Sequence, residues 1–135
     1  MTALVALRRK REAELSRARQ ALEHTRRVHE RCEAARQATA QQLIQLASPP
    51  LAGQALDLVR EATRQAQLSR LRTLLHQQGI AAADEAGRLE RARAAFGDAL
   101  RAMRAVEVLE QRARQPEIDR RRRREAAETE DRNRK

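Results

Sequence analysis

The sequence predicts an all-α fold, a long antiparallel two-helix coiled-coil hairpin. The 135 residues include one Phe, no Trp and no Tyr, although large aromatic side chains supply much of the buried area in compact cores. Charged residues make up 36% of the chain and apolar residues 41%, which is typical of coiled coils and long helices. Helix-breaking residues cluster at one interior place, Ser48 to Gly53. Two helical arms joined there explain all of these observations.

The first helix is predicted over about residues 2–47. Apolar or small residues recur along it at spacings of three, four or their sums: Leu4, Leu7, Leu15, Ala18, Leu22, Val28, Cys32, Ala35, Leu43 and Leu46. This stripe is narrow, as expected for a seam between two helices rather than a face on a broad core. Arg11 falls on the seam line, where its long stem can cover apolar surface while its guanidinium reaches water.

The break at residues 48–53 ends the first helix because residues that precede proline are pushed out of the helical conformation. A second helical arm follows over about 54–115. Its heptad seam begins at residue 68 and comprises Leu68, Leu71, Leu75, Gln78, Ala82, Glu85, Leu89, Ala92, Phe96, Ala99, Met103 and Val106. An earlier seam, out of phase with the first and therefore predicting a stutter, comprises Leu51, Ala55, Val59, Ala62 and Ala66.

Two arrangements of the second arm are open. In a plain hairpin closed at 48–53, Leu4 faces Phe96. Alternatively the chain bends at 79–80, residues 51–78 form an extra tip helix, and the first helix pairs with roughly 80–125. The heptad pattern passes through Gly79 unbroken, and a glycine inside a helix costs only about 1 kcal/mol, so continuity is favoured.

A charged tail, 116–135, completes a single elongated helical domain over 1–135. Pro116 is expected to stop or kink the second arm. The net charge of +10 is concentrated toward the two chain ends. The five consecutive arginines Arg120 to Arg124 have three readings: contacts with nucleic-acid phosphates, contacts with an acidic protein surface, or a solvated helix end.

A basic cluster, Arg8 to Arg11, adjoins two seam leucines near the N-terminus, which favours a protein partner there. The residues expected to bind protein come from this N-terminal region and from the charged tail. They are Leu4, Leu7, Arg8, Arg9, Arg11, Arg120, Arg121, Arg124 and Glu128.

No motif predicts catalysis, a cofactor or a metal, so a non-enzymatic protein is expected. His29 and Cys32 lie three residues apart, but a structural zinc site needs about four ligands and the chain has one cysteine. A two-helix pair also offers no concave site that excludes water. No apolar run approaches the roughly 20 residues that span a bilayer, and no cleavable secretory signal is evident, so membrane insertion is not expected and the cytoplasm is the expected compartment.

The order of these features resembles the FliJ/YscO family, the central stalk proteins of flagellar and virulence type III secretion. The resemblance lies in a leucine-spaced start with a basic-acidic run (Leu4 to Leu15), a short interruption, and a long second arm with an Arg/Glu-rich end (Arg120 to Glu128). It is a likeness of size and pattern, without a diagnostic motif.

This resemblance implies a bacterial stalk or adaptor that engages a hexameric export ATPase, links it to an export-gate membrane protein and, in some members, handles secretion chaperones. Such a protein would be cytoplasmic, peripheral to a membrane secretion complex, and monomeric or weakly self-associating. The alternative from the residues alone is a basic coiled coil that binds nucleic acid or acts as a structural or chaperone-like adaptor.

Overall fold

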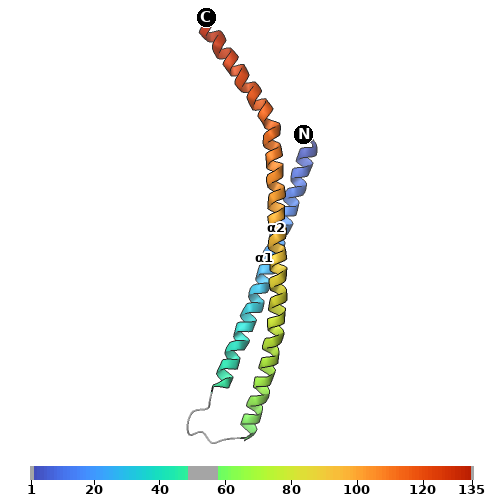
Figure 1. Cartoon of the computed structure of the whole chain (residues 1–135), viewed down its shortest axis with the longest axis vertical. Helices are drawn as coiled ribbons and strands as arrows, with labels where there is room; N and C mark the ends of the chain where they lie inside the picture. Colours follow the sequence, from blue (N-terminus) through green and yellow to red (C-terminus); the bar gives the residue numbers. More distant parts are fainter. Residues whose placement is uncertain (1, 49–57, 135) are drawn as a thin grey trace. The chain divides into compact units, whose positions relative to one another are not determined.

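The computed structural model describes residues 2–48 and 58–134. Within these ranges the chain forms two helices and no strand: α1 (Thr2–Ala47) and α2 (Leu58–Arg134) (Figure 1). The predicted all-α helical hairpin is confirmed. Ser48 forms a bend after α1, whereas the rest of the predicted break, and Leu51 and Ala55 of the predicted early seam, lie outside the described residues.

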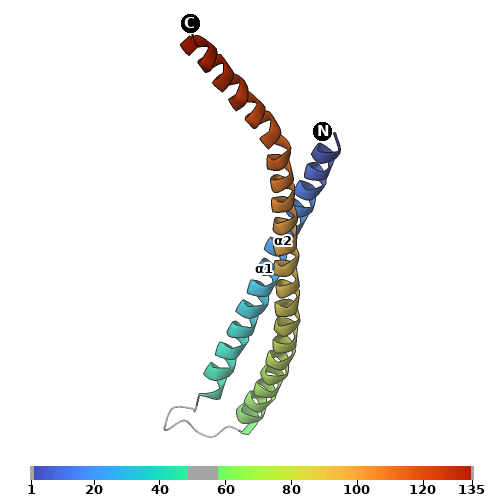
Figure 2. The same cartoon turned by 45° about the horizontal axis from the view of Figure 1, so that its top comes forward.

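The helices divide into two compact units. The central unit comprises residues 20–94, and the terminal unit comprises residues 1–19 and 95–135. Each unit holds one part of α1 beside an antiparallel part of α2 (Figure 2).

The seam of α2 is the one that the heptad pattern predicts. All of its predicted positions from Leu68 to Val106 are buried or half-buried. The most buried are Leu68, Ala82 and Leu89 in the central unit, and Met103 and Val106 in the terminal unit. On α1 the predicted positions are half-buried except Ala35, which is exposed. Arg11, which the sequence places on the seam line, is also half-buried, and its side chain is 35% exposed.

A polar residue, Thr39, is the most buried side chain of α1, at 4% exposure. Its hydroxyl donates a hydrogen bond of 3.0 Å to the carbonyl oxygen of Ala35, one turn earlier in the same helix. A hydroxyl bonded to its own helix can be buried without an orphaned donor. The apolar pattern missed Thr39 because the residue is polar. Its spacing of four residues from Leu43 is the feature that places it on the seam.

The predicted stutter at the start of α2 is wrong. Val59 is 75% exposed, and Ala62 and Ala66 are also exposed. The half-buried residues in these turns are Glu61 and Arg64, which keep the heptad phase of Leu68. The physical reason is that the α2 side which meets the end of α1 carries Arg64 and Leu68, and Val59, Ala62 and Ala66 lie on other sides of the helix.

The pairing of the helices also differs from the plain-hairpin prediction. Leu4 lies beside Ala113 and Glu117 rather than opposite Phe96, and Arg8 contacts Glu110. In the central unit Leu46 lies beside Leu71. Matching of the two seams sets this register. The first large apolar residue of the α2 seam is Leu68, so the last leucines of α1 pack there and the earlier turns of α2 run past them.

The long second helix has no interruption. It continues through Gly79 and Ile80, so the alternative with a separate tip helix is not what forms. It also continues through Pro116, which the sequence expected to stop or kink the arm. Proline removes one hydrogen bond and crowds the preceding turn, which bends a helix without ending it. Figures 1 and 2 show α2 changing direction in its orange-to-red part, which contains Pro116.

An arginine from α2 completes the C-terminal end of α1. The last turn of α1 contains no basic residue, although its final carbonyl groups lack partners within the helix. Arg64 supplies the donors: its Nε lies 2.8 Å from the carbonyl oxygen of Leu46, and its Nη2 lies 3.2 Å from that of Ala47. Glu61 accepts a hydrogen bond of 3.1 Å from Nη1 of the same guanidinium. A cation therefore sits where the helix dipole is negative.

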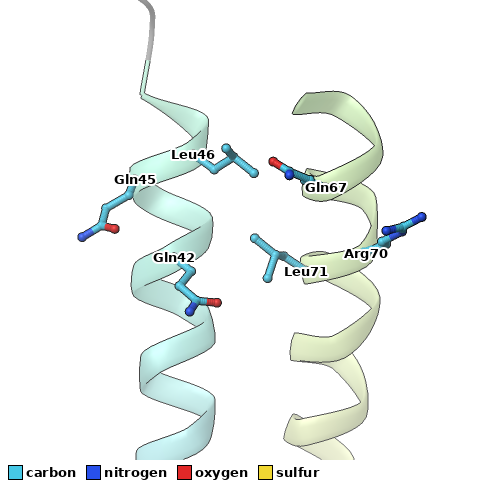
Figure 3. Close-up of a pocket in the computed structure, with 6 residues that line it drawn as sticks. All are labelled: Gln42, Gln45, Leu46, Gln67, Arg70 and Leu71. Atoms are coloured by element: carbon cyan, nitrogen blue, oxygen red, sulfur yellow. The ribbon is translucent and has the colours of Figure 1, made fainter. Parts of the chain in front are cut away.

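Next to this contact the seam opens into a groove of about 480 Å³. Leu46 and Leu71 point toward each other across it, and Gln67 points toward α1, whereas Gln45 and Arg70 point away (Figure 3). The apolar contact at this end of the seam comes from a few leucines, including the buried Leu68, and the Arg64 contact adds to it.

We expect Arg64→Ala to lower the free energy of unfolding by about 1–2 kcal/mol, because hydrogen bonds from a charged donor to otherwise unpaired carbonyls are lost. Urea unfolding followed by circular dichroism measures this. Arg70→Ala is the matched control, since its side chain points away from α1 (Figure 3). Equal loss of stability in the two variants would contradict the assigned role of Arg64.

The same contact predicts a pH dependence. The pKa of Glu61 lies below its usual value of 4.5, chiefly because Gln65 donates a hydrogen bond to the carboxylate, with a further contribution from the charge of Arg64. A carboxyl pKa that is lower in the folded state stabilises the fold above pH 4.5, and this contribution is lost as pH falls through the folded-state value.

Glu61→Gln has no such titration, so we expect its stability to fall less steeply than that of the wild type between about pH 5 and pH 3. Urea unfolding at a series of pH values gives the two slopes. Parallel slopes for the two proteins would show that Glu61 makes no pH-dependent contribution.

Candidate protein-binding site

All residues predicted to bind protein belong to the terminal unit. Leu4, Leu7, Arg8, Arg9 and Arg11 come from the first turns of α1, and Arg120, Arg121, Arg124 and Glu128 from the last turns of α2. The structure places these two groups in different surroundings, because most of the α1 group already contacts other residues of the chain.

Arg8 is the centre of an ion-pair network that joins the two helices. Its Nη1 lies 2.6 Å from Oε2 of Glu110, and its Nε lies 2.9 Å from Oε1 of Glu12. Glu110 follows Val106 on the seam and is only 13% exposed, and Arg114 approaches the same carboxylate at 3.7 Å. The pKa of Arg8 is raised by its hydrogen bond to Glu12 and by the charge of Glu110.

Two further members of the α1 group are also in use. Leu7 is half-buried on the seam, and Arg11 is half-buried with its Nη1 3.0 Å from Oε2 of Glu14. Arg9 is exposed. Leu7 and Arg8 therefore contribute to the helix pair, and Arg11 pairs with a carboxylate of its own helix. Arg9 and Lys10 are the exposed members of the basic cluster.

An open groove of about 500 Å³ lies where the start of α1 meets α2. Leu4 and Val5 line one side and Ala113 the other, with the charged groups of Arg8, Glu110, Arg114 and Glu117 around them. Val5 is 50% exposed and was not among the predicted residues. Val5 lies off the seam line. The one feature of the sequence that could have indicated it is that two large apolar residues, Leu4 and Val5, are neighbours in the chain.

The arginines of the α2 group are exposed, and none has an ion pair or hydrogen bond within the part of the chain that the structure describes. The register explains their exposure. Leu4 and Val5 already lie beside Ala113 and Glu117, so the turns of α2 that follow extend past the start of α1. The heptad positions there are Arg120 and Arg124, which offer no apolar stripe to a packing helix.

We call residues 120–124 the arginine cluster. Acidic residues follow it, and Glu128 lies one turn after Arg124 on the same side, but the two do not form an ion pair within 4.0 Å. Guanidinium groups in this state can donate two parallel hydrogen bonds to a carboxylate or a phosphate. The arrangement can therefore bind an anionic surface.

The described residues contain no group of three or more side chains that could hold a metal ion; His29 and Cys32 are half-buried on α1. None of the described helical stretches is long and apolar enough to cross a lipid bilayer. Comparisons with known protein families, with curated proteins and with solved structures find no match for this chain.

The Arg8–Glu110 pair gives a test of the helix register in the terminal unit. We expect Arg8→Glu to lower the melting temperature, because the new carboxylate at position 8 then faces the largely covered carboxylate of Glu110. Exchange of the charges in Arg8→Glu/Glu110→Arg is expected to recover part of the loss, because it restores the attraction between the two positions but places like charges beside Glu12 and Arg114.

Arg9→Glu makes the same charge change at an exposed position and serves as the control, with little change in melting temperature expected. Additive effects of the two substitutions, without recovery in the exchanged pair, would show that Arg8 and Glu110 are not coupled.

Proposed function

We propose that this chain is a non-enzymatic stalk or adaptor protein of a bacterial type III secretion system. In this proposal it is cytoplasmic, engages the hexameric export ATPase, and connects that ring to the export gate at the membrane, with secretion chaperones as further partners. The proposal joins the family resemblance in the sequence to the helical hairpin of the structure.

The observation that carries the proposal is the arginine cluster, which is exposed, without ion pairs in the described residues, and placed where α2 extends past α1. A narrow seam leaves most of a helix pair available to partners, and arginine matches carboxylates in both charge and geometry. The groove at Leu4 and Val5 lies in the same unit and adds an apolar contact to the charged one. A partner surface with carboxylates around an apolar patch suits both.

The same arginines support a second candidate, a basic coiled coil that binds nucleic acid through its phosphates. Two observations favour a protein partner instead. Acidic residues from Glu125 to Asp131 directly follow the arginine cluster, and these would repel a phosphate backbone. The single aromatic residue, Phe96, is half-buried on the seam and cannot stack on exposed bases.

The decisive measurement is ATP hydrolysis by a purified bacterial type III export ATPase, with and without the full-length protein. We expect binding and an increased rate or an increased hexamer fraction. Replacing Arg120, Arg121 and Arg124 by Glu is expected to weaken binding at least about tenfold, which is 1.4 kcal/mol or more. The matched control replaces Arg26, Arg27 and Arg31, which are exposed on α1, and should bind like the wild type.

Equal weakening in the two triple variants would show that net charge alone drives the association. No binding, together with no change in rate or hexamer fraction, would overturn the proposal. Tight binding to duplex or single-stranded fragments that persists near about 150 mM salt would replace it by the nucleic-acid candidate.

A further inference from the structure

The central unit carries a second surface that the proposed function does not use. It is an open groove of about 590 Å³ on the side of α2, lined by the apolar or small residues Leu75, Gly79, Ile80 and Ala83. Arg36 reaches it from α1, and Arg72 and His76 flank it on α2. We call this surface the Gly79 groove.

Gly79 has no evident role in the packing of its own chain. A glycine inside a helix costs about 1 kcal/mol relative to alanine. A Cβ atom built at Gly79 would meet no atom within 4 Å, and no positive φ is present at this position. Neither crowding nor backbone geometry therefore requires glycine here. The remaining physical advantage of glycine is that another backbone can approach the helix closely.

The floor of the Gly79 groove is apolar and open to solvent. Ile80 is 61% exposed although it lies in the middle of a long helix, and Leu75 is half-buried beside it. Isolated exposed apolar residues are common on protein surfaces, but here Ile80 adjoins the hollow at Gly79 and the apolar edge of the seam. An apolar side chain from a partner could contact Leu75, Ile80 and Ala83 there.

The charge around the Gly79 groove has one sign. Arg36 and Arg72 line it, and no carboxylate does. The nearest ion pair is that of Arg36 with Glu33, at 3.7 Å, and it leaves the Arg36 side chain 49% exposed. The partner should therefore carry carboxylates on each side of its apolar contact.

We propose that the Gly79 groove binds an acidic amphipathic helix of a partner protein, with an apolar side chain of that helix placed over Gly79 and Ile80 and its carboxylates on Arg36 and Arg72. A second copy of this chain fits less well. A symmetric contact through this surface would bring the same two arginines of each copy together. This proposal uses the central unit and is independent of the arginine cluster.

The test measures binding of synthetic helical peptides to the full-length chain by fluorescence anisotropy in about 150 mM NaCl, where charge attraction is screened beyond about 8 Å. The probe is a peptide of about 18 residues with leucines spaced three and four apart and glutamates beside them. A scrambled peptide of identical composition and a version with lysine in place of glutamate are the comparison probes. We expect the amphipathic acidic peptide to bind at least about tenfold more tightly than either.

Variants locate the site. Gly79→Leu fills the hollow, and Arg72→Glu reverses one flanking charge, so each is expected to weaken binding at least about tenfold. Gly87→Leu and Arg27→Glu make the same changes at positions that do not line the groove, and both should bind like the wild type. Circular dichroism checks folding, and both glycine variants should keep or raise helicity because leucine favours helices more than glycine does.

Equal binding of the scrambled peptide would overturn the proposal, since charge alone would then suffice. Unchanged binding in Gly79→Leu would also overturn it. Self-association that Gly79→Leu abolishes, seen by light scattering, would assign the groove to a second copy instead. A single-stranded RNA that displaces the peptide from the wild type but not from Arg72→Glu would assign it to nucleic acid.

Discussion

The unbroken heptad phase of α2 is the constraint on which the rest of this structure depends. From Glu61 to Glu110 the same side of the helix faces α1 in each unit, although the residues on it range from leucine to glutamine, glutamate and arginine. So thin a seam contributes modest apolar burial, and Gln78 even places its side-chain oxygen there without a hydrogen-bond partner. The spacing of the seam residues, rather than a large apolar core, therefore specifies this fold, and the charged contacts of Arg8 and Arg64 add to the register that the matching of the two seams sets.

Arg64 in the central unit and Arg8 in the terminal unit each provide a partner for a polar group of the other helix. Arg64 supplies the positive charge that the last turn of α1 lacks, and Arg8 pairs with a carboxylate that the seam has largely covered. Each joins α1 to α2 through a group that must keep a partner once it leaves water. Arginine suits both places because its long stem can lie on apolar surface while its planar head makes several hydrogen bonds.

Sequence reasoning located the helices and the α2 seam because apolar spacing reports directly which side of a helix is covered. It misplaced Val59 and the partner of Leu4 because register depends on how two distant stripes match, which no local pattern contains. It missed Thr39 because a hydroxyl bonded to its own helix looks like a surface residue in the sequence. The predicted binding residues stay a prediction. Among them Arg8 pairs with Glu110 of the other helix and Arg11 with Glu14 of its own, and charge alone cannot distinguish an arginine that binds a partner from one that pairs with a carboxylate of its own chain.

The turns of α2 that hold the arginine cluster are held by their own backbone hydrogen bonds alone, without a seam. Because they bury no apolar surface against α1, we expect these turns to unfold locally more readily than the paired regions. Each opening presents consecutive arginines to trypsin. Limited proteolysis should therefore remove this end of the chain first. A partner bound to the arginine cluster should slow that cleavage, so the cleavage rate reports whether the cluster is bound.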